Sequence, residues 1–199
     1  MKTIYLAAVM ASALSLSAPA TAGFFDLTLA PFIGASVGQA SYDMTCPAGS
    51  TCDDTDTAWK IYGGLEVNEY ISMEAGYVNL GKFEASGTTE DGPVSATAEV
   101  HGMRIQVIGS YAINPSFSLI GRGGMNILNL EKNGTIAAPT NNVGDTDVAW
   151  SLGLGAQFNL SESVGLRAEW ERYFKVGDED TTGEMDIDLI SASIVYTFR

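Results

Sequence analysis

Residues 166–174, "LRAEWERYF", alternate large apolar side chains with charged ones. Arg167, Glu169 and Glu171 fall on one parity of this stretch, and Trp170 falls with the other apolar residues on the opposite parity. A period of two is typical of a β-strand whose two faces meet different surroundings. In a soluble sheet the charged face would meet water and the apolar face would cover a core, whereas a strand in a membrane barrel reverses this arrangement.

The same alternation recurs in seven further segments, so the sequence predicts eight strands in all. The weakest segment is the first, where Pro31 has no N–H to donate to a neighbouring strand and is expected near the strand's start. No run of eighteen apolar residues occurs after the N-terminal segment, so no spanning helix is expected. The seven segments are 27–37, 59–67, 71–77, 103–111, 117–127, 148–158 and 190–198.

The connections between these segments alternate between short and long. Short turns on one side and long loops on the other are typical of an outer-membrane barrel, and strands of about 9–11 residues suit a tilted crossing of the bilayer. We therefore predict an all-β fold, an eight-stranded antiparallel transmembrane up-and-down barrel with both termini in the periplasm. Short connections are expected at 67–70, 113–116 and 159–163, and long ones at 39–57, 82–100, 130–146 and 175–186.

The aromatic residues give an independent reason to prefer a membrane barrel. They lie on the apolar parity, and the predicted topology sorts them by height into two groups. Two aromatic girdles around an apolar band are expected of a barrel in a bilayer, whereas a soluble, lipocalin-like binder would not carry outward apolar belts. The lower group is Tyr70, Tyr111, Phe117, Phe158, Tyr196 and Phe198, and the upper group is Trp59, Tyr77, Trp150, Trp170 and Phe174.

The first 22 residues predict export. Lys2 gives a positive start, a short apolar run follows, and residues 20–22 are the small residues of a cleavage site. These are the features of a secretory signal peptide, and the apolar run is too short to span a membrane. We expect cleavage after Ala22, which makes 1–22 a signal peptide and 23–199 the barrel domain.

The chain is strongly acidic, with 24 Asp and Glu against 10 Lys and Arg and a formal net charge of −14. Nucleic acid is therefore not expected as a partner, because phosphate binding needs a surplus of basic residues. The acids gather in the long connections, where they form either a solvated loop surface or a loose site for divalent cations shared with lipid phosphates. These acids are Asp43, Asp53, Asp54, Asp56, Glu84, Glu90, Asp91, Asp145, Asp147, Asp178, Glu179, Asp180, Glu184 and Asp186.

Two cysteines, Cys46 and Cys52, lie close together in "TCPAGSTC". An exported chain meets an oxidising compartment, and a pair with this spacing can close a small loop, so we predict a disulfide between them. A metal site would need further Cys or His ligands nearby, and the sequence offers none there. No cofactor is expected.

Four basic and four acidic residues fall on the inward parity, so their charges cancel. An eight-stranded barrel has an interior just wide enough for side chains, and buried charges must pair or lose their ionisation. One interpretation is a salt-bridged plug that fixes the shape of the barrel. The other is a narrow gated conduit for small solutes or ions, in which an acid exchanges partners between two bases. The eight residues are Lys60, Arg104, Arg122, Arg167, Glu66, Glu74, Glu169 and Glu171.

An enzyme that modifies lipids is the least expected function. Such chemistry needs a nucleophile beside a base, and the chain has one histidine, His101, with no serine two residues away. We predict no catalytic residue.

The expected role is structural, in envelope integrity, with the acidic loops as a surface for a partner. The alternative is the narrow gated channel.

Three stretches resemble the OmpA-type transmembrane barrel family. They are "AWKIYGGLEVNEYISMEAGYVNLGKF" (58–83), "LRAEWERYFKVGD" (166–178) and "DIDLISASIVYTF" (186–198), and the resemblance covers most of 25–198. It implies an eight-stranded barrel in the outer membrane of a Gram-negative bacterium, surrounded by lipid and lipopolysaccharide. Longer relatives carry a peptidoglycan-binding domain after the barrel, and we do not expect that activity here because this chain stops at Arg199.

The resemblance also implies roles for individual residues. The terminal strand ends in Tyr196 and Phe198, which is similar to the signal that the barrel-insertion machinery reads in this family. The gate proposed for the family is matched here by candidate residues of the inward charge set. These are Glu74, Glu169, Arg122 and Arg167.

Overall fold

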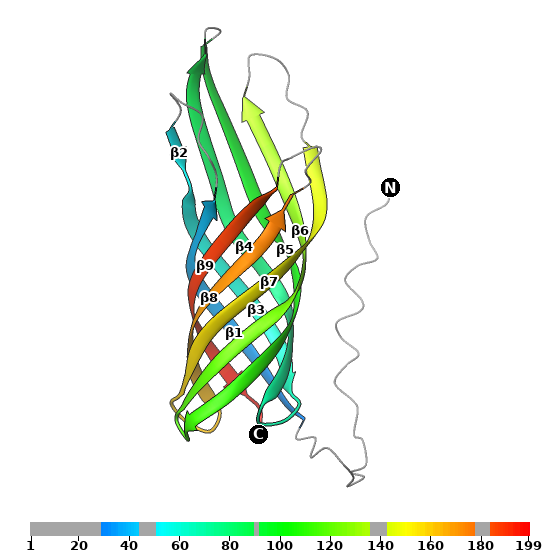
Figure 1. Cartoon of the computed structure of the whole chain (residues 1–199), viewed down its shortest axis with the longest axis vertical. Helices are drawn as coiled ribbons and strands as arrows, with labels where there is room; N and C mark the ends of the chain where they lie inside the picture. Colours follow the sequence, from blue (N-terminus) through cyan, green and yellow to red (C-terminus); the bar gives the residue numbers. More distant parts are fainter. Residues whose placement is uncertain (1–28, 44–50, 90–91, 136–142, 178–183) are drawn as a thin grey trace.

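The structure is a computed structural model and describes residues 29–43, 51–89, 92–135, 143–177 and 184–199 of the 199-residue chain. These residues form nine β-strands (Figure 1), and among them no helix is long and apolar enough to cross a membrane. The expected signal peptide, 1–22, and Cys46 lie outside the described residues. The strands are β1 (Ala30–Asp43), β2 (Thr51–Asp53), β3 (Thr55–Glu66), β4 (Ile71–Thr89), β5 (Gly92–Asn114), β6 (Phe117–Thr135), β7 (Val143–Asn159), β8 (Val164–Val176) and β9 (Met185–Thr197).

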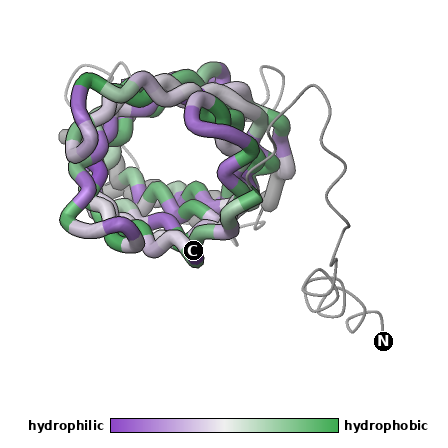
Figure 2. The backbone as a smooth tube through the Cα atoms, turned by 90° about the horizontal axis from the view of Figure 1, so that it is seen from below, coloured by the Kyte–Doolittle hydropathy of each residue, from purple (hydrophilic) through white to green (hydrophobic). Residues whose placement is uncertain are grey.

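Eight of the strands close into an antiparallel ring. From β3 onwards each strand pairs with the next along the chain, and β1 joins the two ends by pairing with both β3 and β9. Figure 2 shows this ring end-on. The remaining strand, β2, has three residues and pairs with β4. The prediction of an eight-stranded antiparallel barrel is therefore confirmed.

Short turns join the strands at the end of the barrel where the C-terminus lies, at the bottom of Figure 1. In two of these turns an asparagine satisfies backbone N–H groups, as this side chain commonly does in tight turns. Asn68 Oδ1 accepts hydrogen bonds from the N–H groups of Tyr70 (2.9 Å) and Ile71 (2.8 Å). Asn114 Oδ1 accepts one from the N–H of Ser116 (3.0 Å). The three predicted short connections are confirmed.

The strands extend further toward the opposite end than the sequence predicts. β4 has 19 residues and β5 has 23, whereas about 9–11 residues suffice for a tilted crossing of the hydrocarbon layer. The prediction of a long loop over 82–100 was wrong, because the described residues of this range all belong to β4 or β5. The long loop over 130–146 was predicted too long for the same reason, since its described residues belong to β6 or β7. The ranges 39–57 and 175–186 were also too wide, because the strands extend into both ends of each.

The strands are longer than predicted because the apolar residues move from the outward face of the wall to the inward face partway along a strand. In β4, Glu74 points inward in the lower part, whereas Val78 and Leu80 point inward higher up and are fully buried. β6 changes in the same way between Asn126 and Leu128. The alternation persists but its polarity reverses, as expected where the outer surface of the wall meets water instead of lipid.

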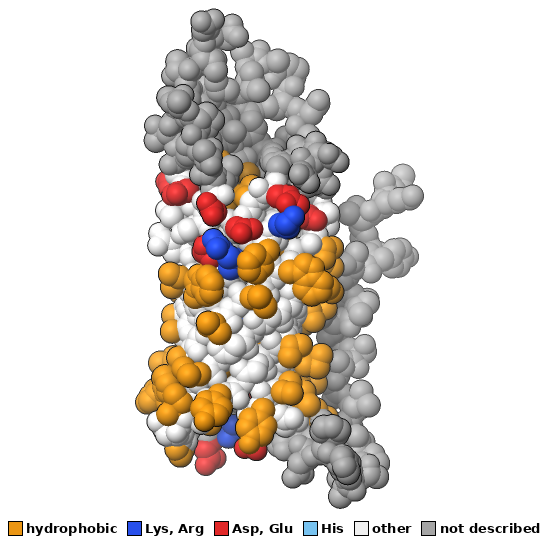
Figure 3. All heavy atoms as spheres, in the orientation of Figure 1, with side chains coloured by type: hydrophobic (Ala, Val, Ile, Leu, Met, Phe, Trp, Pro, Cys, Tyr) orange, Lys and Arg blue, Asp and Glu red, His pale blue; other side chains and the backbone are white. Residues whose placement is uncertain are grey.

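The outward face below this reversal is apolar. Leu154, Trp150 and Ile190 expose 65%, 62% and 68% of their surface, while Glu171 on the inward face of β8 exposes none. Figure 3 shows the exposed apolar side chains on the barrel wall and charged side chains gathered above them. The apolar parity of 166–174 therefore faces outward, and its charged parity lies inside the barrel.

Candidate functional site

A layer of charged side chains crosses the lumen in its lower half, and we call it the charged layer. Its members come from five strands, which places residues far apart in the sequence in one contiguous cluster. Their side chains are between 0% and 5% exposed, so the charges are removed from water. The charged layer consists of Lys60 (β3), Glu74 (β4), Arg104 (β5), Arg122 (β6) and Arg167, Glu169 and Glu171 (β8).

Glu171 connects three of the four cations. Its carboxylate pairs with Lys60 Nζ, with Arg104 Nη2 at 2.6 Å and with Arg122 Nε at 3.4 Å. Arg104 also donates a hydrogen bond from Nη1 to the hydroxyl of Tyr173 (3.3 Å). Because charge-assisted bonds to arginine are among the strongest that side chains make, this carboxylate ties β3, β5 and β6 to β8.

Glu169 and Glu74 extend the charged layer toward the lower end. Glu169 pairs with Arg122 and with Lys60 Nζ (3.2 Å), and it accepts a hydrogen bond from the hydroxyl of Ser193 (3.2 Å). Glu74 lies within reach of three arginines, since it pairs with Arg122, with Arg104 Nη2 (3.7 Å) and with Arg167 Nη1 (3.4 Å). Every acid of the charged layer is therefore shared between at least two cations.

Glu66 does not join the charged layer. It ends β3 near the lower mouth, where its carboxylate lies 3.8 Å from Arg199 Nη2 and accepts a hydrogen bond from the hydroxyl of Thr197 (3.4 Å). The charged layer thus holds four cations and three carboxylates, whereas the inward parity suggested four of each. The charged layer, as far as the structure describes it, therefore carries one more positive than negative charge, although each cation contacts at least one acid.

A second set of polar side chains lies beside the charged layer and was not singled out from the sequence. Gln106 and Asn126 each donate a hydrogen bond to the hydroxyl of Ser151 (3.0 Å for both), and Asn126 also donates to the carbonyl of Ala149 (3.2 Å). All three side chains are buried. The signal that could have found them is their place on the inward parity next to Arg104 and Arg122.

Comparison with known proteins agrees with this architecture. The family model of the OmpA-like transmembrane domain matches residues 30–199. The chain belongs to the OmpA-like transmembrane domain family. As in the relatives of this family, its place is the outer membrane, so the outward apolar face of the barrel is in contact with lipid.

The OmpA-like chain has distant relatives of greater length. It is 24% identical over 172 residues to outer membrane protein A of Escherichia fergusonii, covering 84% of this chain and 48% of that protein. It is 24% identical over 140 residues to outer membrane protein A of Klebsiella pneumoniae, covering 69% and 40%. The chain therefore spans about half the length, or less, of the curated relatives it matches.

Solved structures agree on the OmpA-like fold. Neisserial surface protein A aligns with a TM-score of 0.64 at 10% identity, over 84% of this chain and 97% of that one. Ail, the attachment invasion locus protein of Yersinia pestis, aligns with a TM-score of 0.51 at 13% identity, over 85% and 97%. At this level of identity the likeness concerns the fold alone.

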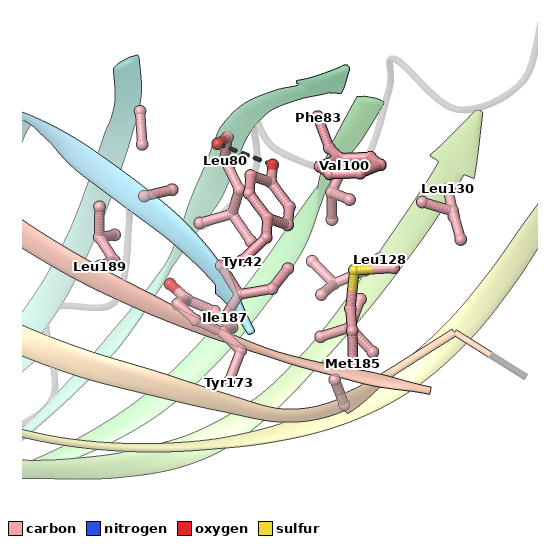
Figure 4. Close-up of a cluster of buried hydrophobic side chains, with 14 of the residues drawn as sticks. Tyr42, Leu80, Phe83, Val100, Leu128, Leu130, Tyr173, Met185, Ile187 and Leu189 are labelled. Carbon is pink, nitrogen blue, oxygen red and sulfur yellow. Dashed lines mark hydrogen bonds between the residues drawn. The ribbon is translucent and has the colours of Figure 1, made fainter. Parts of the chain in front are cut away.

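The lumen of this OmpA-like barrel is filled with apolar side chains above the charged layer (Figure 4), and we call this group the apolar cluster. Leu80, Leu189 and Tyr173 are fully buried there. The hydroxyl of Tyr42 donates a hydrogen bond to the carbonyl of Leu80 (3.0 Å), and the Tyr42 ring lies 6.1 Å from that of Phe83. The other members include Val78, Val100, Leu128, Leu130, Val176, Met185 and Ile187.

Two aromatic rings lie below the charged layer. Phe32 and Tyr62 are almost fully buried, and the guanidinium of Arg167 lies 5.5 Å and 6.0 Å from their ring centres, within the range of cation–π attraction. A Cβ at Gly34 would lie 2.4 Å from the ring of Tyr62, and a Cβ at Gly64 would lie 2.4 Å from the ring of Phe32. Both rings therefore need a glycine opposite them. At the lower mouth a polar cavity of about 260 Å³ follows.

The remaining predicted residues lie away from the lumen. Tyr196 and Phe198 are about half exposed on the outer surface, and their rings meet edge to face at 5.0 Å. His101 stacks on Tyr77 with ring centres 6.1 Å apart. Cys46 is outside the described residues, so its pairing with Cys52 stays a prediction. Within the described part of the chain, no group of three or more His, Cys, Asp or Glu is arranged to hold a metal ion.

Proposed function

We propose that this outer-membrane barrel is a structural protein of the cell envelope whose lumen is closed by a plug. The observation that carries the proposal is the charged layer, in which side chains from five strands are at most 5% exposed and every acid is shared between cations. Buried ion pairs of this kind hold the elements that carry them in one arrangement, because separating them would leave an unpaired charge out of water. The wall is thereby braced from inside.

The apolar cluster supports a closed lumen over a channel. An ion that crossed the barrel would have to pass Leu80, Leu128 and Leu189, which are fully buried and cannot replace its hydration shell. The two hydroxyls in the apolar cluster, of Tyr42 and Tyr173, are already hydrogen-bonded to other groups. One observation favours the gated conduit instead. Glu74 contacts three arginines, so its carboxylate has alternative partners without leaving the charged layer.

Single-channel recording in planar bilayers tests the plug against the conduit. With a closed plug, the wild-type protein shows no resolved openings, and neither Glu74→Ala nor the matched variant Glu66→Ala at the lower mouth changes the trace. Openings in the wild type that change with Glu74→Ala and not with Glu66→Ala would replace the plug by the gated conduit. Heat-modifiable gel migration checks that each variant is folded.

The outer rim of the barrel suggests a surface role in addition. Acids dominate it, among them Asp43, which is 74% exposed at the side chain. Those bases of the rim whose side chains the structure describes are paired with acids, such as Lys82 with Glu99 at 3.7 Å. The Ail structure contains a heparin analogue, which is a polyanion. We propose that a partner of this chain is cationic instead, because an acidic rim repels a polyanion. Cells displaying the barrel should bind polylysine-coated and not heparin-coated beads.

Three further proposed features concern export, disulfide formation and membrane insertion. Residues 1–22 serve as a signal peptide, Cys46 and Cys52 form a disulfide in a long connection, and the terminal aromatics Tyr196 and Phe198 are read by the barrel-insertion machinery. We assign the chain no enzymatic activity and no cofactor. Mass spectrometry of the protein extracted from outer membranes tests the first two points, since it gives the N-terminal residue and the state of both thiols. Phe198→Ala should slow insertion, which protease digestion after pulse labelling measures.

A further inference from the structure

The outward face of the barrel is hollowed across four neighbouring strands, from β5 to β8. A groove of about 690 Å³ lies there, and its lining is almost entirely apolar. Gly121 and Gly123 of β6 form its floor. Leu152 and Leu154 of β7 and Trp170 of β8 form its wall.

The groove exists because small and large residues alternate across neighbouring strands at outward positions. Gly121 pairs in register with Leu154, which in turn pairs with Trp170, so the floor and the wall lie side by side. A Cβ added to Gly121 would come within 4 Å of one side-chain atom only, a Leu154 methyl at 3.8 Å, so the space above this glycine is open. On a lipid-facing surface, such an apolar hollow accommodates a hydrocarbon chain.

A cationic side chain stands at one end of the groove. Arg172 lines it together with Phe174, four residues beyond Trp170 on β8. The guanidinium is 32% exposed at the side chain, and its ion pairs with Asp188 (3.0 Å) and Asp43 (3.7 Å) both use Nη2. Its Nε makes no hydrogen bond within the described residues but is buried, so Nη1, which has no partner among those residues, is the nitrogen left for an outside ligand. A guanidinium has five N–H donors, which match the oxygens of a phosphate.

We propose that this groove binds a single lipid of the outer leaflet. An acyl chain lies between the glycine floor and the wall formed by Leu152, Leu154 and Trp170, and the headgroup phosphate meets Arg172. The combination of an apolar trough with a partly exposed guanidinium carries the choice of occupant. An acyl chain fits the trough, and a headgroup phosphate can accept from the Nη1 donors that the pairs with Asp43 and Asp188, both through Nη2, leave unused. A second copy of the chain is the competing occupant.

Quenching of single tryptophans by brominated lipids tests the phosphate contact. The protein has three tryptophans, and replacing Trp59 and Trp150 by Phe leaves Trp170 as the reporter in the groove wall. The full chain is reconstituted in phosphatidylcholine vesicles that contain brominated phosphatidylcholine or brominated phosphatidic acid. We expect phosphatidic acid to bind at Trp170 about two- to fivefold more strongly than phosphatidylcholine, as one partly exposed ion pair allows. A chain that keeps only Trp59, on β3, should show a ratio near one.

Two pairs of matched variants separate the contributions. Arg172→Gln should abolish the preference for phosphatidic acid, whereas Lys82→Gln, which removes a positive charge from the same rim on β4, should leave it unchanged. Gly121→Leu fills the trough and should reduce quenching of Trp170 by brominated phosphatidylcholine. Gly63→Leu, at an outward glycine of β3 with no atom within 3.4 Å of the added Cβ, should not.

The proposal is overturned if Arg172→Gln keeps the preference, or if Gly121→Leu quenches like Gly63→Leu. It is also overturned if Trp170 is shielded from both brominated lipids while chemical cross-linking yields a dimer, because the groove then belongs to a contact between two copies. Heat-modifiable gel migration of every variant confirms that the barrel being measured is folded.

Discussion

Neutralising Glu171 would reveal how strongly the charged layer braces the barrel. This carboxylate is fully buried and pairs with Lys60, Arg104 and Arg122. In Glu171→Gln the three cations keep only two acids near them, and the charged layer changes from one excess positive charge to two. Removing one partner of a buried ion pair costs about 3–5 kcal/mol, so the free energy of unfolding should fall by this amount. Urea unfolding of the protein in phosphatidylcholine vesicles, followed by tryptophan fluorescence, measures it.

Two control variants make this experiment specific. Glu66→Gln removes an acid from the partly exposed pair with Arg199, and the expected loss is below about 1 kcal/mol. Lys60→Met leaves three cations and three acids in the charged layer, and because each acid keeps an arginine partner, the expected loss is below about 2 kcal/mol. If Glu171→Gln unfolds at the urea concentration of the wild type, or if Lys60→Met is the more damaging of the two, the reasoning is refuted.

Packing on both sides of the wall leads to three further expectations. Gly64→Ala should lower the free energy of unfolding by about 1–3 kcal/mol, because its Cβ would lie 2.2 Å from a backbone carbonyl oxygen. In the same urea titration Gly63→Ala, whose Cβ would have 3.5 Å of space, should change it by less than about 0.5 kcal/mol. Leu189→Ala should cost about 2–5 kcal/mol, since it opens a cavity in the apolar cluster; an unchanged unfolding midpoint would contradict this. Spin labels at Leu154 and Ile194 should be relaxed by oxygen and not by a water-soluble nickel chelate, and the opposite result would contradict an outward apolar face.

The barrel could be predicted from the sequence because lipid imposes a simple rule on each strand. Residues 166–174 show this rule, because alternation along the strand places Trp170 on the opposite face from Arg167 and Glu169. If the two charged residues lie inside the barrel, Trp170 lies on the outer surface, where lipid is its favourable surrounding. The short turns were equally readable, because Asn68 and Asn114 stand where backbone N–H groups need an acceptor. Parity and turn chemistry are local properties, and a barrel of this kind follows from local properties repeated around a ring.

The composition of the charged layer was only partly accessible from the sequence. Parity places Glu66 and Glu74 on the same inward face, but it carries no information on height along the barrel. Height depends on the stagger between strands, which the pairing register determines. In the structure Glu74 reaches Arg104 and Arg122, whereas Glu66 lies beside Arg199 at the mouth. The excess positive charge of the charged layer can therefore be recognised only when the pairing register of the strands is known.

The outer half of the barrel was missed for a different reason. Around Leu80 and Val100 the sequence still alternates, but the apolar residues now belong to the inward parity. A strand pattern defined by lipid on the outside ends at this point, so the sequence predicts a loop there. The bulge between Asn79 and Gly81, where Gly81 has a φ of 85°, interrupts the period further.

The reversal of polarity along the wall determines how deeply the protein sits in its bilayer. In β4 the change occurs between Tyr77 and Leu80, and in β6 it occurs between Ile127 and Leu130. The boundary between the lipid-facing and the water-facing part of the barrel therefore falls within a few residues on each of these strands. Such a border gives the barrel a fixed hydrophobic height. A thicker membrane would have to thin around it, at a cost that grows with each ångström of mismatch. Bilayer thickness would therefore influence where in the envelope this chain accumulates and which lipids gather around it.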